Sequence, residues 1–196
     1  MHRVAILTIL ALSLPLAGCE TLGLSDPPAE TTVDLGPACP STAVLSDAVT
    51  VTKLKPGAPL SMLNPADVAF FAEMSQAVLS CNYDRVANRL TLDVNFAVNA
   101  KRGPAAAGAD PGLDFFVAIV DADNNIISKA LYRSQPDMGG KNTNIYTQTV
   151  SNFPVPLAMD KRPADYEILT GFQLTPAEFA YNRLPKPVPA ARAAAR

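Results

Sequence analysis

Cys19 is the residue of this 196-residue chain whose surroundings point most directly to covalent chemistry. It follows two small residues, Ala17 and Gly18, and the bulky Leu16 lies three residues before it. Small side chains are what a signal peptidase accepts at its cleavage site, but an ordinary secretory signal needs no cysteine there. The position of this cysteine therefore indicates that its thiol is modified. The alternative is an ordinary signal peptide in which the cysteine occurs by chance.

The segment before this cysteine has the pattern of a secretory signal. A fixed positive charge on Arg3 precedes an almost wholly apolar run over residues 4–16. That run is too short for a membrane-spanning helix, which needs about 20 apolar residues. With its small residues and cysteine, Leu16-Ala17-Gly18-Cys19 resembles a bacterial lipobox. The resemblance implies that residues 1–18 are removed and that Cys19 carries acyl chains such as palmitate on its thiol-linked glyceride and on its new amine.

The lipobox resemblance also carries an expectation about location. In lipoprotein sorting, Asp after the acylated cysteine favours retention in the inner membrane, and this chain has Glu20 there. The resemblance therefore implies the outer membrane rather than the inner one. Two acyl chains already hold a protein firmly, at about 0.8 kcal/mol per buried methylene. We expect a protein of the cell envelope that is anchored by lipid and faces the periplasm.

Composition excludes several classes of site in the mature chain. The only histidine is His2, so a chain that begins at Cys19 cannot form Ser-His-Asp or Cys-His sites and lacks the commonest zinc and copper ligand. Of the 16 basic residues one, Arg3, leaves with the signal, so 15 face 18 acidic residues. This weakly acidic balance argues against a nucleic-acid partner. We predict no catalytic residue, no cofactor, no metal and no enzymatic activity.

The two remaining cysteines, Cys39 and Cys81, predict one structural disulfide in the oxidising periplasm. Two buried free thiols or a redox pair are the alternatives, although no C-x-x-C spacing supports redox chemistry. Residues 19–38 contain several Pro, Thr and Ser, and they predict a flexible tether of roughly 25 Å average length. Residues 185–196, with three prolines and five alanines, predict a disordered tail. One folded domain is left at 39–184.

Strict alternation marks the clearest element of that domain, over Arg89–Asn99. Every second residue is apolar, which predicts a strand with one face on the core and one in water. Such strands usually belong to antiparallel sheets. Further strands are predicted over Ala48–Leu54, Asp67–Cys81, Asp114–Val120, Ile126–Arg133, Ile145–Phe153 at an edge, and Asp165–Leu174.

Two segments favour a helix to different degrees. In Asp67–Cys81 a helix is the alternative, because Asn64-Pro65 resembles a cap followed by a first-turn proline. Thr175-Pro176-Ala177-Glu178 is a capping box, and it predicts a short helix from Pro176 to about Leu184. About seven strands, the turns between them and one disulfide predict an all-β fold, an antiparallel, immunoglobulin-like β-sandwich. The absence of Trp distinguishes it from a standard immunoglobulin domain.

Several motifs resemble ligand sites without meeting their requirements. Asp121-x-Asp123-x-Asn125 opens like a calcium loop, but Ile126 and Tyr132 replace the required Gly and Glu, so a hairpin turn is favoured. Gly103 and Gly108 have the glycine spacing of a phosphate loop, but the required Lys and Ser or Thr are missing. The five tyrosines favour packing over a sugar platform. For the pairs Lys101-Arg102 and Asn182-Arg183, capping or solvation is favoured over partner contacts.

Five segments carry a resemblance that extends from Cys39 to about Leu184. They are Arg102-Gly103-Pro104-Ala105, Phe116-Val117-Ala118-Ile119-Val120, Asp165-Tyr166-Glu167-Ile168, Gly171-Phe172-Gln173-Leu174 and Tyr181-Asn182-Arg183. In these segments the chain resembles a family of small uncharacterised lipoproteins of alphaproteobacteria. The resemblance implies an envelope location and a β-rich periplasmic domain, and it implies no activity.

The leading hypothesis is a non-enzymatic, lipid-anchored module that binds or scaffolds an envelope protein or glycan. A second hypothesis is a cell-wall hydrolase with two carboxylates about 5–9.5 Å apart in one cleft. Asp121, Asp123 and Glu167 are its candidates, and the sequence does not bring them together. A third hypothesis is a carrier of a small apolar ligand, which needs an apolar cavity between the sheets.

Overall fold

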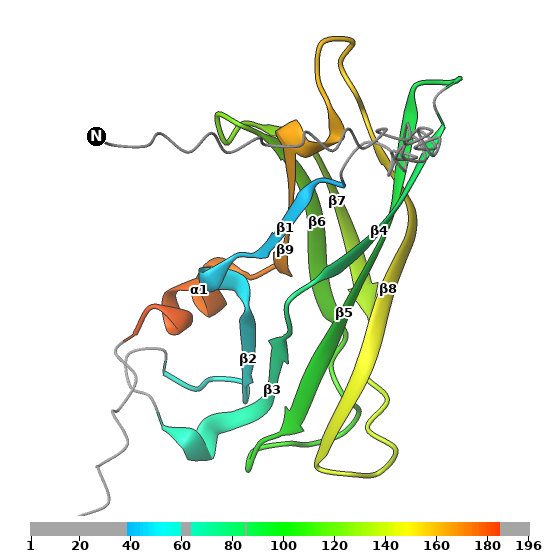
Figure 1. The fold of residues 1–196 in the computed structure, drawn as a ribbon. Helices are drawn as coiled ribbons and strands as arrows, with labels where there is room; N and C mark the ends of the chain where they lie inside the picture. The colour runs from blue at the N-terminus through cyan, green and yellow to red at the C-terminus, as the bar shows by residue number, and fades with distance from the viewer. Residues whose placement is uncertain (1–38, 60–63, 85, 185–196) are drawn as a thin grey trace, which may run out of the picture. The chain divides into compact units, whose positions relative to one another are not determined.

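Two β-sheets build the part of the chain that the structure, a computed structural model, describes: residues 39–59, 64–84 and 86–184. Nine strands and one short C-terminal helix lie in these ranges (Figure 1), which confirms the predicted all-β sandwich. The predicted signal at 1–18, the tether at 19–38 and the tail at 185–196 lie outside the described residues. No helix in the described ranges is long and apolar enough to span a membrane.

The first sheet has four strands in the order β1-β9-β6-β7. Their bounds are Ser41–Val44 for β1, Tyr166–Phe172 for β9, Leu113–Asp121 for β6 and Ile126–Ser134 for β7. The pairs β6–β7 and β6–β9 are antiparallel, whereas β1 runs parallel to β9. The sequence did not predict β1, because four residues are too few to show an alternating pattern.

The second sheet has five strands, with β5 at its centre. Their bounds are Thr50–Leu54 for β2, Val68–Met74 for β3, Val78–Asp84 for β4, Arg89–Arg102 for β5 and Thr143–Val155 for β8. β5 pairs with β3 and β4 along one edge and with β8 along the other. The sheet order is therefore β2-β3-β5-β4, and β8 pairs with β5 on the opposite side.

The predicted single strand over Asp67–Cys81 is wrong in its length, although strand rather than helix is confirmed. The segment forms two strands, β3 and β4, separated by residues 75–77. The cap signal before it belongs to a shorter element, the 3₁₀ helix Pro65–Asp67, in which the Asn64 side chain accepts a hydrogen bond from the Ala66 N–H at 3.1 Å. Asn64 and Pro65 start a helical turn. The turn ends after Asp67 because the residues of β3 that follow have a high strand propensity.

The core lies between the two sheets and is built from alternate residues of their central strands. On β5 the inward residues Leu90, Leu92, Val94, Phe96, Val98 and Ala100 are all buried. Phe115 of β6 meets Phe96 edge-on, with ring centroids 5.2 Å apart, and stacks on Tyr132 of β7 at 5.4 Å. The alternation of apolar and polar residues that predicted β5 thus identifies the face of this strand that contacts the other sheet.

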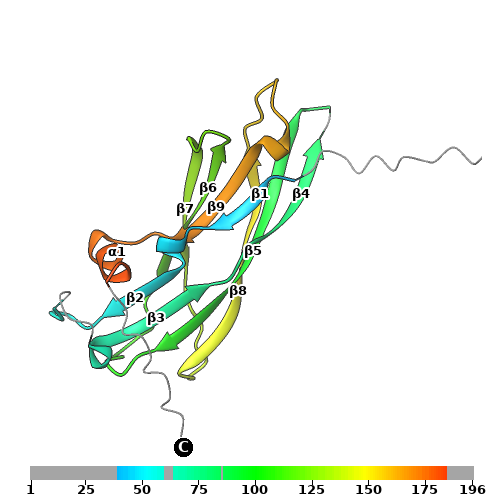
Figure 2. The same cartoon turned by 60° about the vertical axis from the view of Figure 1, so that its left-hand side comes forward.

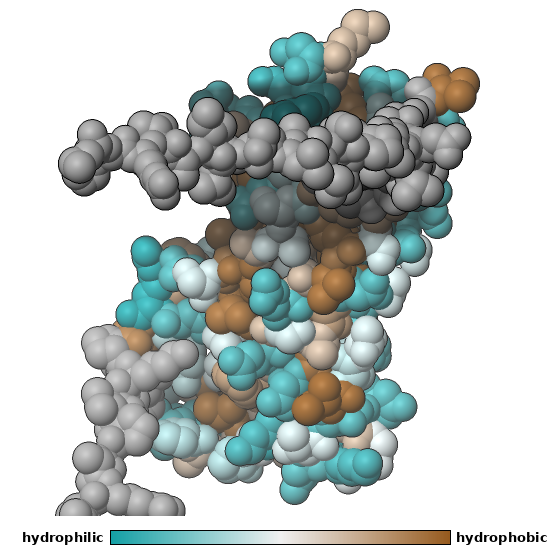
Figure 3. Space-filling model, in the orientation of Figure 1, coloured by the Kyte–Doolittle hydropathy of each residue, from teal (hydrophilic) through white to brown (hydrophobic). Residues whose placement is uncertain are grey.

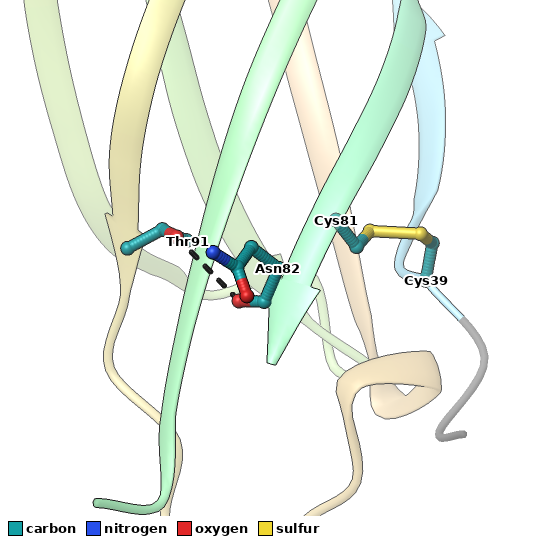
Figure 4. The surroundings of a disulfide bond; sticks show 4 residues. All are labelled: Cys39, Cys81, Asn82 and Thr91. Carbon is teal, nitrogen blue, oxygen red and sulfur yellow. Dashed lines mark hydrogen bonds between the residues drawn. A yellow bond between two sulfur atoms is a disulfide. The ribbon is translucent and has the colours of Figure 1, made fainter. Parts of the chain in front are cut away.

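A disulfide joins Cys39, which lies just before β1, to Cys81 of β4, as predicted. Figure 4 shows Cys81 directed from β4 toward the segment that enters β1. Because β1 belongs to the first sheet and β4 to the second, the bond links the two sheets. It closes a sequence separation of 42 residues.

The predicted capping box starts the C-terminal helix α1, Pro176–Asn182. The Thr175 hydroxyl accepts from the Glu178 N–H at 3.3 Å, and the Glu178 carboxylate accepts from the Thr175 N–H at 2.8 Å. The helix ends two residues before the predicted Leu184. It packs on β2 and on the 3₁₀ helix Ser46–Ala48, which occupies the start of the strand predicted from Ala48.

Candidate functional site

The hydrolase hypothesis has a counterpart in the structure, since Asp121 and Glu167 line one pocket of about 510 Å³. The antiparallel pairing of β6 with β9 brings them together, because it places Asp121 opposite Tyr166. Asp160 and Asp165 line the same pocket, together with Lys161. The third candidate, Asp123, is not among the lining residues.

Hydrogen bonds stabilise two carboxylates of this acidic pocket, those of Asp121 and Asp165, in the ionised form. Asp121 accepts hydrogen bonds from the N–H groups of Asp123 at 2.9 Å and Asn125 at 2.8 Å, and from the Asn125 side chain at 3.0 Å. The Asn125 side chain is the main cause that lowers the pKa of Asp121. The hydrogen bond from Arg162 lowers the pKa of Asp165. A general acid of a glycosidase needs the opposite, a raised pKa.

Asp121-x-Asp123-x-Asn125 forms the hairpin turn that the sequence favoured, between β6 and β7. Asn124 has a φ of 63°, the left-handed region that Asn tolerates. Among the described residues, no group of three or more His, Cys, Asp or Glu side chains is placed to hold a metal ion.

A more enclosed and less polar hollow lies where α1 covers the edge of the second sheet. We call it the α1 cleft; its volume is about 560 Å³. It is lined by Thr50, Thr52, Pro65, Val68, Phe71, Lys101, Gly103, Pro104, Tyr181 and Asn182. Adjacent strands provide its floor, because Thr52 pairs with Phe71 and Phe71 pairs with Lys101 across β2, β3 and β5. Residues paired in this way point to the same face of a sheet.

Gly103 shapes one wall of the α1 cleft. Its N–H donates to the Ala69 carbonyl at 2.9 Å, and the Ala105 N–H donates to the Val68 carbonyl at 2.9 Å, so the chain continues along β3 after β5 ends. A Cβ on Gly103 would lie 2.1 Å from the Val68 carbonyl oxygen. This close approach of two backbones requires glycine.

The opposite wall is α1, which polar contacts hold on the sheet. The Asn182 side-chain amide donates to the carbonyls of Thr50 at 2.8 Å and Asp47 at 3.1 Å. Glu178 pairs with Lys53, and Arg183 pairs with Asp47 at 3.4 Å. The wall is therefore attached at both its first and its last turn.

The attachment of α1 depends on pH through the ionisation of the Glu178 carboxylate. Burial raises the pKa of Glu178, but the hydrogen bonds from Lys53 and Thr175 outweigh it, and the net pKa is below the usual value of 4.5. A lowered carboxylate pKa contributes stability that is present above the unfolded value and is lost as the pH falls through the folded value. The contribution of Glu178 to the attachment of α1 is therefore present at neutral pH and is lost in acid.

Lys101 provides the cationic side chain among the described lining residues of the α1 cleft. Its neighbour Arg102 is neutralised by Asp110, which accepts two hydrogen bonds from the guanidinium at 2.7 Å each. The same bonds lower the pKa of Asp110. Lys101 is exposed and forms no ion pair with an acidic side chain among those described. Lys101, Gly103 and Pro104 also line an adjoining pocket of about 830 Å³.

The lining of the α1 cleft suits the binding of an apolar group. None of its described residues is His, Cys, Asp or Glu. Apolar and aromatic side chains with a few polar groups, in a volume of 300–1,000 Å³, are typical of pockets that hold apolar groups. Figure 3 shows apolar side chains on the visible face of the domain in separate clusters between polar ones, so a defined cleft is a better candidate than a broad apolar surface.

Sequence reasoning had singled out the two polar pairs that flank the α1 cleft without placing them in a site. Arg102, Asn182 and Arg183 hold a loop and the helix in place through ion pairs and hydrogen bonds to residues of other segments, which is neither the capping nor the solvation that the sequence favoured. Lys101 instead faces the cleft. The apolar lining residues of the cleft, such as Phe71, carry no sequence motif. They become part of a cleft only because α1, which is distant in sequence, packs beside them. Two of the five resemblance segments, around Gly103 and Tyr181, meet here.

Cys19, the predicted lipidation site, lies outside the described residues. Comparison of the chain with protein-family models, with curated proteins and with solved structures gives no match.

Proposed function

We propose that this protein is a lipid-anchored, non-enzymatic binding protein of the cell envelope that faces the periplasm. The lipobox around Cys19 supports the anchor, and Glu20 after it supports the outer membrane rather than the inner one. The observation that carries the binding function is the α1 cleft, an apolar hollow with two firmly attached walls. We propose that it receives an apolar group of an envelope protein.

The position of the α1 cleft supports this function. Cys39 is the first described residue of the domain and the one nearest in sequence to the proposed anchor at Cys19. Its disulfide partner Cys81 lies opposite Leu92 of β5. Lys101 at the cleft is nine residues further along this strand, a distance of about 30 Å at 3.3 Å per residue. The cleft is therefore distant from the residue at which the described domain begins.

Cys19→Ala is expected to abolish lipid attachment, because alanine has no thiol to acylate. Labelled palmitate should enter the wild-type chain and not the variant, which should stay an uncleaved precursor or become soluble on membrane fractionation. Thr21→Ala, two residues away, is the matched control and should retain the label. Incorporation of label into the Cys19→Ala variant would refute the anchor.

A photoreactive phenylalanine analogue in place of Phe71 tests the cleft itself. In intact cells, it is expected to give a crosslinked protein adduct of defined mass, because this position lines the α1 cleft. The same analogue in place of Asn82, which is exposed on β4 of the same sheet, is the control and should not give that adduct. Equal adducts from both positions, or adducts with lipid alone, would contradict a protein partner. An adduct of small mass at Phe71 would instead indicate a small apolar ligand.

A further inference from the structure

The outer edge of β8 is unpaired in the part of the chain that the structure describes. β8 spans 13 residues and pairs with β5, and none of the strands described here pairs with its other side. Figure 2 shows β8 along the margin of its sheet. An edge of this kind presents a row of main-chain N–H and C=O groups that can extend the sheet with another strand. We propose that β8 is a dimerisation edge, where a second copy of this chain pairs its own β8 antiparallel across a two-fold axis.

The other marginal strands among the described residues have features that oppose strand addition. β1 has four residues and β2 has five, and α1 packs on β2. β7 carries Lys129 and Arg133, and the Cys81 disulfide ties β4 to Cys39. Short strands, charges and covering elements are the usual protection of sheet edges. β8 is long, has no charged residue from Thr143 to Val155, and has its one proline at position 154.

The chemistry of β8 suits a copy of itself. In a two-fold dimer, each residue near the axis faces the same residue or a close neighbour, so a charged strand would place like charges together. β8 has no charge to repel its copy. On the face of the sheet that points away from the core, β8 carries Thr143, Ile145, Thr147 and Thr149. All four residues are exposed, and Ile145 is 67% exposed. β-Branched residues facing one another stabilise adjacent strands.

The geometry of β8 limits pairing to the regular part of the strand. The strand is regular up to Val150, and a register shift then follows opposite Leu92 and Val94, with Asn152 at a φ of 56°. A two-fold axis at Thr147 pairs residues 144–150 of the two copies and keeps this irregular part outside. Thr147 then faces Thr147 of the other copy, and Ile145 faces Thr149. The result is a continuous sheet of ten strands, five from each copy.

β8 is already held in the conformation that pairing requires. The Ser134 hydroxyl of β7 donates to the Tyr146 hydroxyl at 3.0 Å, and burial raises the pKa of that tyrosine. The Thr149 hydroxyl donates to the Asn95 side chain of β5 at 2.7 Å. A strand fixed in this way loses little conformational freedom on binding. The inference is independent of the function proposed for the α1 cleft.

Sedimentation of the detergent-solubilised full-length chain tests the dimer. The wild-type chain is expected to sediment as a dimer, and Thr147→Lys as a monomer, because it places two ammonium groups face to face at the axis. Asn99→Lys is the matched control: Asn99 is exposed on β5 and lies opposite Ile145, so the same charge enters the same face one strand away from the edge. This variant should remain dimeric. A monomeric wild-type chain, or a dimer that survives Thr147→Lys, would overturn the proposal.

A short thiol crosslinker tests the register in the same sample. Thr147→Cys is expected to give a covalent dimer. Thr143→Cys should not, because residue 143 would face Ser151 and lie eight residues, about 27 Å, from its copy. Crosslinking through residue 143 but not through residue 147 would refute this pairing, and crosslinking through neither would remove β8 from the interface.

Discussion

Replacing both Cys39 and Cys81 with serine is expected to lower the free energy of unfolding by about 4 kcal/mol, as the chain-entropy model gives for a loop of this size. The bond closes a sequence separation of 42 residues and joins the two sheets. Without the disulfide, the unfolded chain gains conformational entropy and the folded chain does not, so the free energy of unfolding falls. Since the protein has no Trp, chemical unfolding should be followed by far-ultraviolet circular dichroism or by its five tyrosines.

Reductant supplies the control for the disulfide prediction. It should shift the unfolding midpoint of the wild-type chain to that of the double variant, and leave the midpoint of the variant unchanged. Equal midpoints for the oxidised wild-type chain and the double variant would show that the disulfide does not stabilise the fold. Since Cys39 is the first described residue of the domain, we expect the loss to begin with detachment of β1 from its edge position beside β9.

Phe115→Ala is expected to cost about 3–5 kcal/mol, the usual effect of truncating a buried phenylalanine. Phe115 is 1% exposed, lies between the two sheets, and contacts Phe96 and Tyr132. The neighbouring strands pair through their main chains and cannot move together to fill the space. The cavity would therefore persist, and this is the condition under which such substitutions cost most.

Phe116→Ala is the matched control for the core substitution, because it removes the same side chain from the next residue. Phe116 points to the opposite face of β6, where it is 7% exposed in a small cluster with Ala48 and Ala118, lies under the Lys129 ammonium at 4.5 Å and lines an open pocket. Water or the flexible lysine can enter the space that it leaves, so the loss should be smaller. Chemical unfolding of both variants measures the difference, and a larger loss for Phe116→Ala would contradict the assignment of the core.

Binding and dimerisation use different parts of the domain. The α1 cleft lies over β2, β3 and the end of β5, whereas the proposed dimerisation edge is β8, on the other side of β5. None of the β8 residues 144–150 lines the cleft, so a partner there and a second copy at β8 would contact different residues. If both proposals hold, one dimer presents two clefts, and a partner with two binding segments would gain avidity from them.

The candidate site was much less predictable from sequence than the strands were. Asp121 and Glu167 were candidates for one pocket, but only the pairing of β6 with β9 shows that they share one. Phe71 and Tyr181 are 110 positions apart and carry no motif, and they meet because α1 returns to cover β2. Pairings at this sequence separation depend on how sheets and helices pack, and local patterns do not encode them.

Features that arise from residues close together in the chain could be predicted from the sequence. Alternation over Arg89–Asn99 predicted β5, Asp and Asn predicted the turn after Asp121, and the capping box predicted α1, since each depends on residues within a few positions. The sequence also predicted the disulfide between the two cysteines that remain after Cys19, and the structure confirms the bond over the alternatives of two free thiols or a redox pair. The edge position predicted for the strand over Ile145–Phe153 is confirmed, because β8 pairs with β5 alone among the described strands. Only the tertiary structure shows the division of Asp67–Cys81 into two strands, the short strand β1 and the α1 cleft. The physical reason is that these depend on which strand finds which neighbour, and that choice follows from burial across the whole domain rather than from local propensity.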